Sequence, residues 1–437
     1  MRRKLQSLLD RNNSKQALLN AAYILFLLSL LYHFIEQLLT SYDYGSWQIS
    51  EFLINYQGGF VRRGLTGEIL FFFAKHFNIN IEWTIKIVCL ICFAAVCTFF
   101  VRAFLKKGYS LYILPLCFFL GMGVLEVYWI RKDYLFFYVF ISVLWLYNKN
   151  NLSIGKRLIF INILSVFGIL CHEIFAFFAL PILFLLLFNQ YKNKGVLWSV
   201  ILATLSLSPS IFAFFLVIIM HGNIETAQSI WDSWCAILGK TPSEVDHWNV
   251  AGISAIGWTS RWALGYCFRG NFLTVDKDII SSSVWCITFP VVYYIAVNAL
   301  LVFRKNENTF TNKHKTVLSS ILLFQLLCLS PVFIFLSCDY MRVFFYWIAS
   351  SFAIFLLMPM DKIKLFPAVF VNFVERINKV MINILPPSKT TLVFLIMFIG
   401  ICPYWFEIER AYKTTMLYNI LFILSKPLII LKSFLLT

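Results

Sequence analysis

The sequence predicts an all-α fold, namely a polytopic transmembrane bundle of about eleven helices with a helical first loop outside the membrane. Composition is the first reason, because 60% of the 437 residues are hydrophobic and only 13% are charged, about half the charged share of a soluble protein. Apolar runs near 20 residues also recur along the chain, and a helix needs about that length to cross the hydrocarbon core. Lastly, Lys and Arg concentrate in alternate connecting segments, as the positive-inside rule requires.

Candidate spans are the apolar runs 17–39, 83–105, 110–130, 134–148, 158–171, 174–188, 196–220, 284–303, 316–337, 343–360 and 390–406. Three of them (134–148, 158–171 and 174–188) are short, so we expect tilted, broken or deeply buried helices there. A twelfth run, 414–431, is interrupted by Lys426 and Pro427 and either spans or lies at the interface.

The distribution of charge orients this bundle with its N-terminus in the cytoplasm. The net charge of +16 comes from the connecting segments that this threading places inside, so it indicates topology and not nucleic-acid binding. An alternative threading takes 158–188 as one long helix and reverses every later segment. It would place the basic segment 304–315 outside, which the charge distribution disfavours.

We treat 1–437 as one integral membrane domain with two long outer loops, 40–82 and 221–283. The first is expected to form surface helices. The second contains Trp231, Trp234, Trp248, Trp258 and Trp262, which either stack on sugar rings or form an aromatic belt at the interface. Cys235 and Cys267 also fall in this loop, and a periplasmic disulfide between them is left open.

Three short outer turns carry ionic groups, and an inert turn needs none. They hold Arg131, Lys132 and Asp133; His172 and Glu173; and Asp339 and Arg342. Charges beside apolar helices are costly and usually functional. We therefore expect these turns to converge with the first loop in one outer cavity. The structural alternative is interfacial ion pairing and anchoring to lipid headgroups.

The most specific motif is YQGGFVRRGLTGEI, residues 56–69. Gly58 and Gly59 permit a sharp turn, and Arg62 and Arg63 precede an expected surface helix over 64–77. Arginine side chains beside a helix N-terminus make a phosphate seat. The alternative is that both arginines simply extend to lipid headgroups. A nucleotide-binding phosphate loop is excluded, because G-x-x-x-x-G-K-[ST] is absent.

The first outer loop, with an acid near its start and surface helices within it, resembles the GT-C superfamily of integral membrane glycosyltransferases. The 56–69 motif is similar to segments of bacterial polytopic proteins encoded with surface polysaccharides. In size and layout, the chain is most similar to the phage-type serotype-converting O-antigen glucosyltransferases. The chain departs from many superfamily members, which have two adjacent acids in this loop, because Asp43 is followed by Tyr44.

This resemblance implies a bacterial inner-membrane enzyme with a periplasmic active site. The donor would be a sugar, glucose by preference, on undecaprenyl phosphate, and the acceptor would be O-antigen of lipopolysaccharide or another lipid-linked glycan. Membrane lipids are the other expected partners. No cofactor or resident metal is expected, although a divalent metal is left open, and the His172-Glu173 pair lacks the H-E-x-x-H spacing of a zinc site.

Sugar transfer needs a carboxylate base, cations for the leaving phosphate and alignment of the two substrates. We predict Asp43 as the base, then Glu51, then Glu68. The predicted phosphate-binding residues are Arg62, Arg63, Arg131 and Lys132. Supporting roles are expected for Asp133, His172, Glu173, Asp339 and Arg342.

Two rival functions remain open at this stage. A polysaccharide polymerase shares the membrane, the lipid-linked substrate and the outer face, but usually places its catalytic groups in large late loops. A lipid-linked sugar transporter or flippase predicts related halves with ions or broken helices near the midplane. Pro209, Pro290 and Pro331 keep that reading open, whereas the absence of a clear internal repeat disfavours it.

Overall fold

The computed structural model describes the chain continuously over 34–111, 129–149, 151–246, 248–272, 279–304, 311–337, 340–358 and 366–388, with single positions within 17–33 and 391–427. The side chains of 268–288 and 340–341 are outside this description. The described positions of the first apolar run, 17–39, are helical. The runs 110–130, 390–406 and 414–431 lie wholly or largely outside the described residues.

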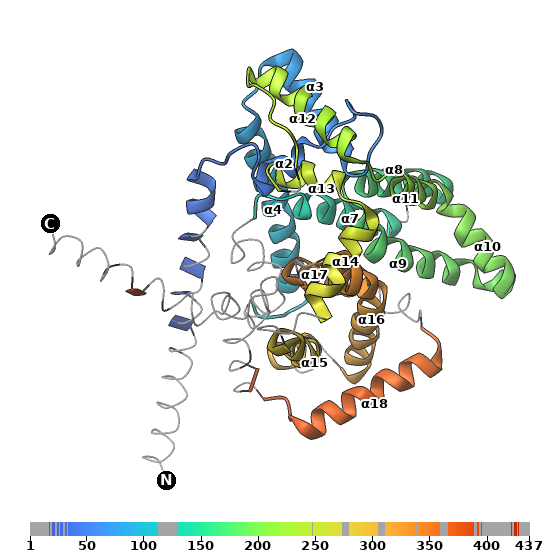
Figure 1. Cartoon of the computed structure of the whole chain (residues 1–437). Coiled ribbons are helices and arrows are strands. Elements are labelled where there is room, and N and C mark those ends of the chain that lie inside the picture. The colour runs from blue at the N-terminus through green and yellow to red at the C-terminus, as the bar shows by residue number, and fades with distance from the viewer. Residues whose placement is uncertain are drawn as a thin grey trace, which may run out of the picture.

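The described chain folds into helices, which Figure 1 shows as a bundle with shorter helices at its upper end. In chain order the helices are α2 (Trp47–Leu53), α3 (Gly64–Phe77), α4 (Ile81–Lys106), α7 (Asp133–Tyr147), α8 (Ile154–Cys171), α9 (Ile174–Tyr191), η1 (Lys192–Lys194), α10 (Val196–Ser206), α11 (Ser208–Ile219), α12 (Ile224–Leu238), α13 (Ala251–Gly257), α14 (Ser260–Phe272), α15 (Ile279–Val302), α16 (Asn312–Pro331), the π-helical turn η3 (Val332–Leu336), α17 (Tyr340–Leu357) and α18 (Ala368–Ile384).

The apolar helices indicate a multi-pass membrane protein, and the described residues contain fewer full-length spans than the eleven expected for the whole chain. Among the described residues, four helices are long and apolar enough to cross a membrane: Ile81–Lys106, Ile154–Cys171, Ile174–Lys194 and Asn312–Leu336. The pair α10 and α11 makes a fifth if it is one span, bent by 63°. Asp133–Tyr147 is a shorter apolar helix, whereas α15 and α17 contain 24 and 18 residues. At 1.5 Å per residue, the 15 residues of α7 reach only about 22 Å.

Helices α7 and α17 are apolar and lie inside the bundle, where protein surrounds them. Phe136 and Phe137 of α7 and Phe344 and Trp347 of α17 are fully buried. By contrast, α4 and α11 expose large apolar side chains such as Ile91 and Phe212, as lipid-facing helices do. A central helix can therefore be shorter than the bilayer, since its neighbours and not lipid cover its ends.

Several helix ends that the threading places on one side of the membrane lie together. At the lower end, Lys107 Nζ donates to the Phe355 carbonyl oxygen at 3.5 Å, and Asn148 Nδ2 donates to the Leu357 carbonyl oxygen at 3.2 Å. There Tyr147 Oη also donates to the Leu186 carbonyl oxygen at 3.0 Å. Because α8 and α9 are two helices that turn back at 172–173, the one-helix reading of 158–188 is wrong.

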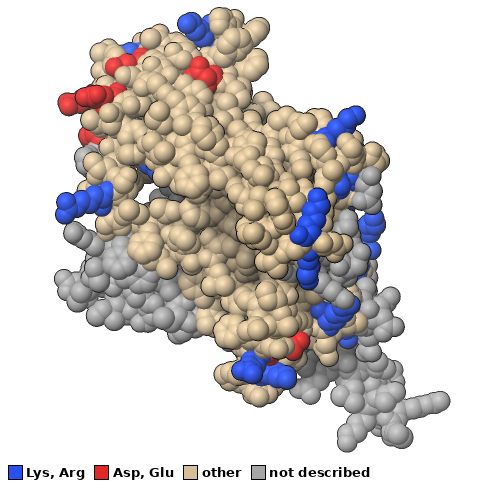
Figure 2. Space-filling model, turned by 90° about the vertical axis from the view of Figure 1, so that its right-hand side faces the viewer, with Lys and Arg blue, Asp and Glu red and all other residues tan. Residues whose placement is uncertain are grey.

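The opposite, upper end carries the short helices of the two loops (Figure 1). Helix α3 packs tightly against the segment after α2, since a Cβ on Gly67 would lie 1.9 Å from the Ile54 carbonyl oxygen. The acidic residues visible in Figure 2 gather mostly at this end, and the centre of that face carries none. Cys235 is a buried free thiol on α12, so the Cys235–Cys267 bridge left open by the sequence is not formed.

Candidate functional site

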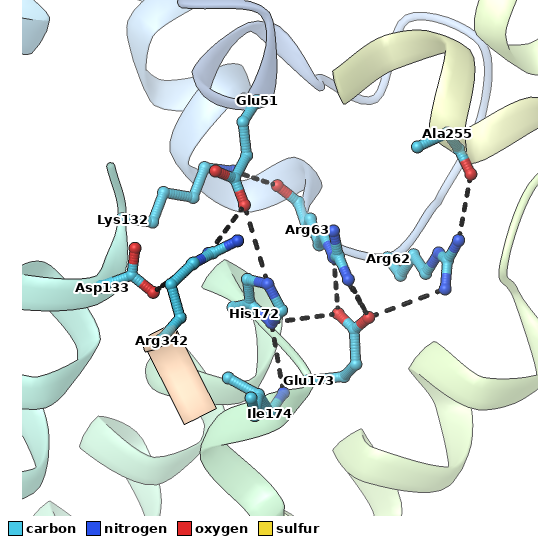
Figure 3. Close-up of polar contacts among 10 residues, drawn as sticks. All are labelled: Glu51, Arg62, Arg63, Lys132, Asp133, His172, Glu173, Ile174, Ala255 and Arg342. Carbon is cyan, nitrogen blue, oxygen red and sulfur yellow. Dashed lines mark hydrogen bonds and ion pairs between the residues drawn. The ribbon is translucent and has the colours of Figure 1, made fainter. Parts of the chain in front are cut away.

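Several helices begin at one buried cluster of charged residues at the upper end of the bundle (Figure 3). Arg63 is the N-cap of α3, Lys132 the N-cap of α7 and Glu173 the N-cap of α9, while Arg342 lies in the first turn of α17. Each helix N-terminus carries about half a positive charge from the aligned peptide dipoles. The backbone therefore adds to the positive field of the basic side chains.

Glu51 projects from the short helix α2 into this cluster and is 2% exposed. Its Oε1 atom lies 3.7 Å from Arg342 Nη2 and 3.6 Å from His172 Nε2. Arg342 also contacts Asp133, with 3.0 Å from Nε to Oδ1. The second oxygen of Glu51, Oε2, is buried and has no hydrogen-bond partner among the described residues. This arrangement leaves one buried carboxylate oxygen that no described side chain pairs with.

The two arginines of the first loop meet Glu173 at the turn between α8 and α9. Arg63 Nε donates to both carboxylate oxygens, at 2.9 and 3.1 Å, and its Nη2 donates to Oε1 as well. Arg62 Nη1 lies 3.6 Å from Glu173 Oε1, and its Nη2 donates to the Ala255 carbonyl oxygen at 3.1 Å. Arg63 adopts a left-handed backbone conformation, φ 63°, which is costly for a residue with a Cβ.

Lys132 connects the first loop to the N-terminus of α7. It is fully buried, and its Nζ donates to the Arg63 carbonyl oxygen at 2.9 Å. The same Nζ lies 5.7 Å from the centre of the Phe52 ring. Burial lowers the pKa of Lys132 to about 8, although the negative charge of Glu51 opposes this shift. Lys132 is therefore a cation whose charge changes near neutral pH.

Glu51 and Glu173 are ionised at neutral pH, whereas His172 is neutral; burial, by contrast, raises the pKa of Asp133. Burial, the largest single effect, would raise the pKa of Glu51, but the surrounding positive charges, Arg342 first and then Arg131, together outweigh burial and lower it to about 2. Burial would also raise the pKa of Glu173, but the charge and hydrogen bonds of Arg63 and the other nearby charges together hold it well below its usual range. Burial, followed by Arg63, lowers the pKa of His172 well below normal. Since His172 Nδ1 accepts the Ile174 N–H at 3.2 Å, Nε2 carries the proton and faces Glu51.

Positive charge is in excess in this cluster. Its basic members are Arg62, Arg63, Arg131, Lys132 and Arg342, and its acidic members are Glu51, Asp133 and Glu173. Arginine binds phosphate oxygens in a fork that matches their geometry, and burial strengthens each charge interaction. The site is thus suited to an anionic group, with a carboxylate beside it that can accept a proton.

Three of the predicted site residues are not placed in the cluster. The Asp43 side chain is 79% exposed, and its Oδ1 lies 3.9 Å from Lys240 Nζ. Glu68 accepts the Tyr56 N–H at 2.9 Å and the Gln57 side-chain amide at 3.1 Å, so it holds the turn of the 56–69 motif. Asp339 lies outside the described residues. The other predicted residues, from Glu51 to Arg342, lie together.

Sequence reasoning missed the part played by helix α13. Its Gly252 packs against α2 so closely that a Cβ there would lie 2.7 Å from both Cα and N of Glu51. The Gly252 N–H also donates to Ser50 Oγ at 2.8 Å, and the Ala255 carbonyl oxygen accepts from Arg62. Small residues in the run AGISAIG (251–257) were the only available signal of such close packing.

Metal ligands do not gather in the part of the chain that the structure describes, where no group of three or more His, Cys, Asp or Glu residues is arranged to hold an ion. The charged side chains of the cluster can bind an anion and transfer a proton. No protein-family model, curated protein sequence or solved structure matches this chain.

Proposed function

We propose that the protein is an integral membrane glycosyltransferase that moves a sugar from a polyprenyl phosphate to a lipid-linked glycan. Glucose on undecaprenyl phosphate is our first choice of donor, and O-antigen or a similar surface glycan our choice of acceptor. The observation that carries this proposal is the burial of Glu51 among basic side chains where several helices begin. Such a donor requires a seat for phosphate with a carboxylate beside it.

The leaving group of this reaction is the lipid phosphate, which gains negative charge as its bond to the sugar breaks. Arg63 and Arg342 are fixed by Glu173 and Asp133 before any substrate arrives. Cations held in place in this way stabilise developing charge without reorganising. Lys132 and the N-termini of α7 and α9 add to the same field. This part of the site is the proposed donor seat.

Glu51 is the proposed base. In the reaction, an acceptor hydroxyl gives its proton to Glu51 Oε2 while the hydroxyl oxygen bonds to the anomeric carbon of the sugar. The bond between that carbon and the phosphate oxygen breaks, and its electron pair leaves with the phosphate. A carboxylate whose pKa is about 2 is a weak base. A bound donor phosphate offsets part of the field of Arg342 and so raises the basicity of Glu51.

The same geometry explains why we prefer Glu51 to the other two acids of the first loop. Asp43 is exposed, and no described contact joins it to the cluster. Its Oδ1 instead lies 3.9 Å from Lys240 Nζ. Glu68 is occupied by hydrogen bonds to Tyr56 and Gln57. Only Glu51 combines burial with a free oxygen beside the basic residues.

The side of the membrane follows from the charge pattern in the sequence. The turns that form the cluster belong to the segments poor in lysine, whereas the basic segments lie at the other end of the helices. By the positive-inside rule the cluster faces away from the cytoplasm. In a bacterium this is the periplasmic face of the inner membrane, where polyprenyl-linked sugars and surface glycans meet.

The test is a transfer assay with the full-length protein in lipid nanodiscs. Labelled undecaprenyl phosphate glucose, or the mannose or galactose equivalent, is mixed with lipid-linked surface glycan from the expressing cells. We expect label to enter the glycan, and Glu51→Gln to lower the rate by about 10²- to 10⁴-fold. Asp43→Asn is the matched control and should retain transfer within about twofold.

Three outcomes would contradict the proposal. Transfer at the normal rate by a well-folded Glu51→Gln variant would remove Glu51 as the base. Failure of every labelled donor would remove the transferase reading. Growth of the unlabelled glycan without any monosaccharide donor would indicate the polymerase instead.

A further inference from the structure

A cluster of aromatic rings lies beside the proposed active site and is formed by two segments far apart in the sequence. Trp258 and Trp262 have ring centres 4.7 Å apart, and Tyr266 stacks on Trp262 at 5.2 Å with only 9° between the planes. Trp248 lies 5.1 Å from Trp258. Trp47, at the start of α2, completes the group at 6.4 Å from Trp258.

We propose that this aromatic platform (Trp47, Trp248, Trp258, Trp262 and Tyr266) binds the sugar rings of the glycan acceptor. The assignment rests on the proposed transferase function and names the subsite that the acceptor would occupy. Tryptophan and tyrosine combine a broad apolar face with a polar N–H or O–H at the edge. A pyranose ring matches both features, since its C–H face is apolar and its rim carries hydroxyl groups.

The platform is joined directly to the proposed base. Trp47 and Glu51 are four residues apart on α2, so both lie on the same face of that helix, one turn apart. Helix α13 contacts the Glu51 backbone through Gly252 and ends at Trp258. Six residues at 1.5 Å each place Trp258 about 9 Å along the axis from Gly252. An acceptor lying on these rings would therefore have its end within reach of Glu51.

Helix α13 also connects the platform to the proposed donor seat, because the Ala255 carbonyl oxygen accepts a hydrogen bond from Arg62. The same seven-residue helix thus touches the acid, one of the phosphate-binding arginines and the first ring of the platform. This arrangement sets the distance between the two substrates, and fixed alignment is a large part of the rate gain in group transfer.

The polarity around the rings favours a glycan over the lipid surface. Trp248 is 49% exposed, and the neighbouring Thr259, Ser260 and Arg261 are exposed and polar. Helix α3 presents the contrasting pattern, because its exposed large apolar residues are Ile69 and phenylalanines such as Phe72 and Phe77. Those side chains carry no polar edge, and they suit the acyl region of a membrane.

Glycan binding is tested without the transfer reaction, using the full-length protein in nanodiscs. The probe is the mixture of soluble oligosaccharides released by mild acid from the surface glycans of the expressing cells, followed by tryptophan fluorescence and saturation-transfer NMR. We expect saturable binding that Trp262→Ala and Trp258→Ala each weaken about tenfold. Trp262→Tyr should retain most of the affinity, since it retains a stacking ring with a polar edge.

The control variants separate this inference from the transferase function. Trp198, which is 59% exposed on α10, is the matched control, and Trp198→Ala should bind the oligosaccharides normally. Glu51→Gln should also bind them normally while losing transfer. Binding that depends on the platform in a protein that transfers no sugar would retain the inference and remove the transferase.

Two results would overturn the inference. The first is wild-type protein that shows no saturable binding of the oligosaccharides. The second is normal binding by both alanine variants, with quenching of the platform by brominated lipids as the sign that the rings face the bilayer instead. If the alanine variant at Trp258 or Trp262 fails to fold, Trp262→Tyr and Trp248→Ala decide the question in its place.

Discussion

Arg63 Nε donates to both carboxylate oxygens of Glu173, at 2.9 and 3.1 Å, although 110 positions separate the two residues in the chain. The contact fastens the first loop to the turn between α8 and α9. Both side chains are largely buried, at 20% and 17% exposure. Removing one member of a buried pair leaves the other charge without its partner, and this costs far more than losing a surface pair.

Replacement of Glu173 should therefore destabilise the whole upper end of the bundle. We expect Glu173→Gln to lower the free energy of unfolding by about 3 kcal/mol, and Arg63→Lys to lower it less, because lysine retains the charge but not the fork. Thermal unfolding of the purified protein, followed by tryptophan fluorescence, measures both. Lys240→Gln is the control, since its exposed contact with Asp43 should contribute almost nothing. Equal melting temperatures for Glu173→Gln and wild type would contradict this prediction.

Binding of a lipid phosphate should weaken as the pH rises through about 8. Burial lowers the pKa of Lys132 to about that value, so the cation of the phosphate seat loses its charge there. We expect the affinity for undecaprenyl phosphate, measured by thermophoresis in nanodiscs, to fall about tenfold between pH 7 and 9.5. Lys132→Met should bind weakly at both pH values. A flat profile for the wild type would show that Lys132 does not contact the phosphate.

The stability of the protein should show the opposite dependence. Between pH 8 and about 10.4, the ordinary lysine value, the unfolded chain keeps the Lys132 proton while the folded chain has released it. Unfolding then takes up a proton, so stability contributed by this residue rises with pH over that window. As the pH rises over this window, the denaturant midpoint of the wild type should therefore increase relative to that of Lys132→Met. The same pH dependence of the midpoint in both proteins would refute this prediction.

The close packing of α13 on α2 should be needed for activity more than for folding. A methyl group on Gly252 would lie 2.7 Å from the Glu51 backbone, so Gly252→Ala must push α2 and its carboxylate away from the site. A displacement near 1 Å costs about 10²-fold in rate, which the transfer assay measures. Gly155→Ala is the matched control, because nothing lies within 4 Å of the added atom. Full activity of Gly252→Ala would show that Glu51 tolerates the shift.

Membrane orientation can be tested by reporter fusions at the ends of the helices. Fusions after Arg131 and His172 should give a periplasmic signal, such as alkaline phosphatase activity, because both residues belong to the cluster. Fusions after Lys107 and Lys192 should give a cytoplasmic signal. Cytoplasmic signals at both cluster positions would invert the bundle and place the proposed active site on the wrong face.

Much of the fold was accessible from periodicity and charge alone. The apolar runs locate α4, α8, α9 and α16 well, because lipid selects long apolar segments regardless of their neighbours. Run length alone cannot tell a helix facing lipid from one enclosed by protein. Residues 134–148 were predicted as a span, yet α7 is buried and only 15 residues long, and α17, at the predicted span 343–360, is buried as well.

Part of the candidate site was likewise predictable from the sequence, and part was not. Arg63, Lys132 and Glu173 stood out in the sequence because charge in or next to apolar segments is expensive. The rank of the acids was not accessible, since Asp43 and Glu51 look alike in a loop. Their environments differ only after folding, when α13 covers the Glu51 backbone and Asp43 stays exposed.

By itself the sequence determined a helical membrane protein and which of its turns carry charge. These properties depend on local composition, because each apolar helix satisfies its own backbone whatever surrounds it. Only the tertiary structure decided which charges meet, which helices are central and which carboxylate is left with an unpaired oxygen. Those properties depend on burial and on distances between residues far apart in the chain, and no local pattern of residues encodes them.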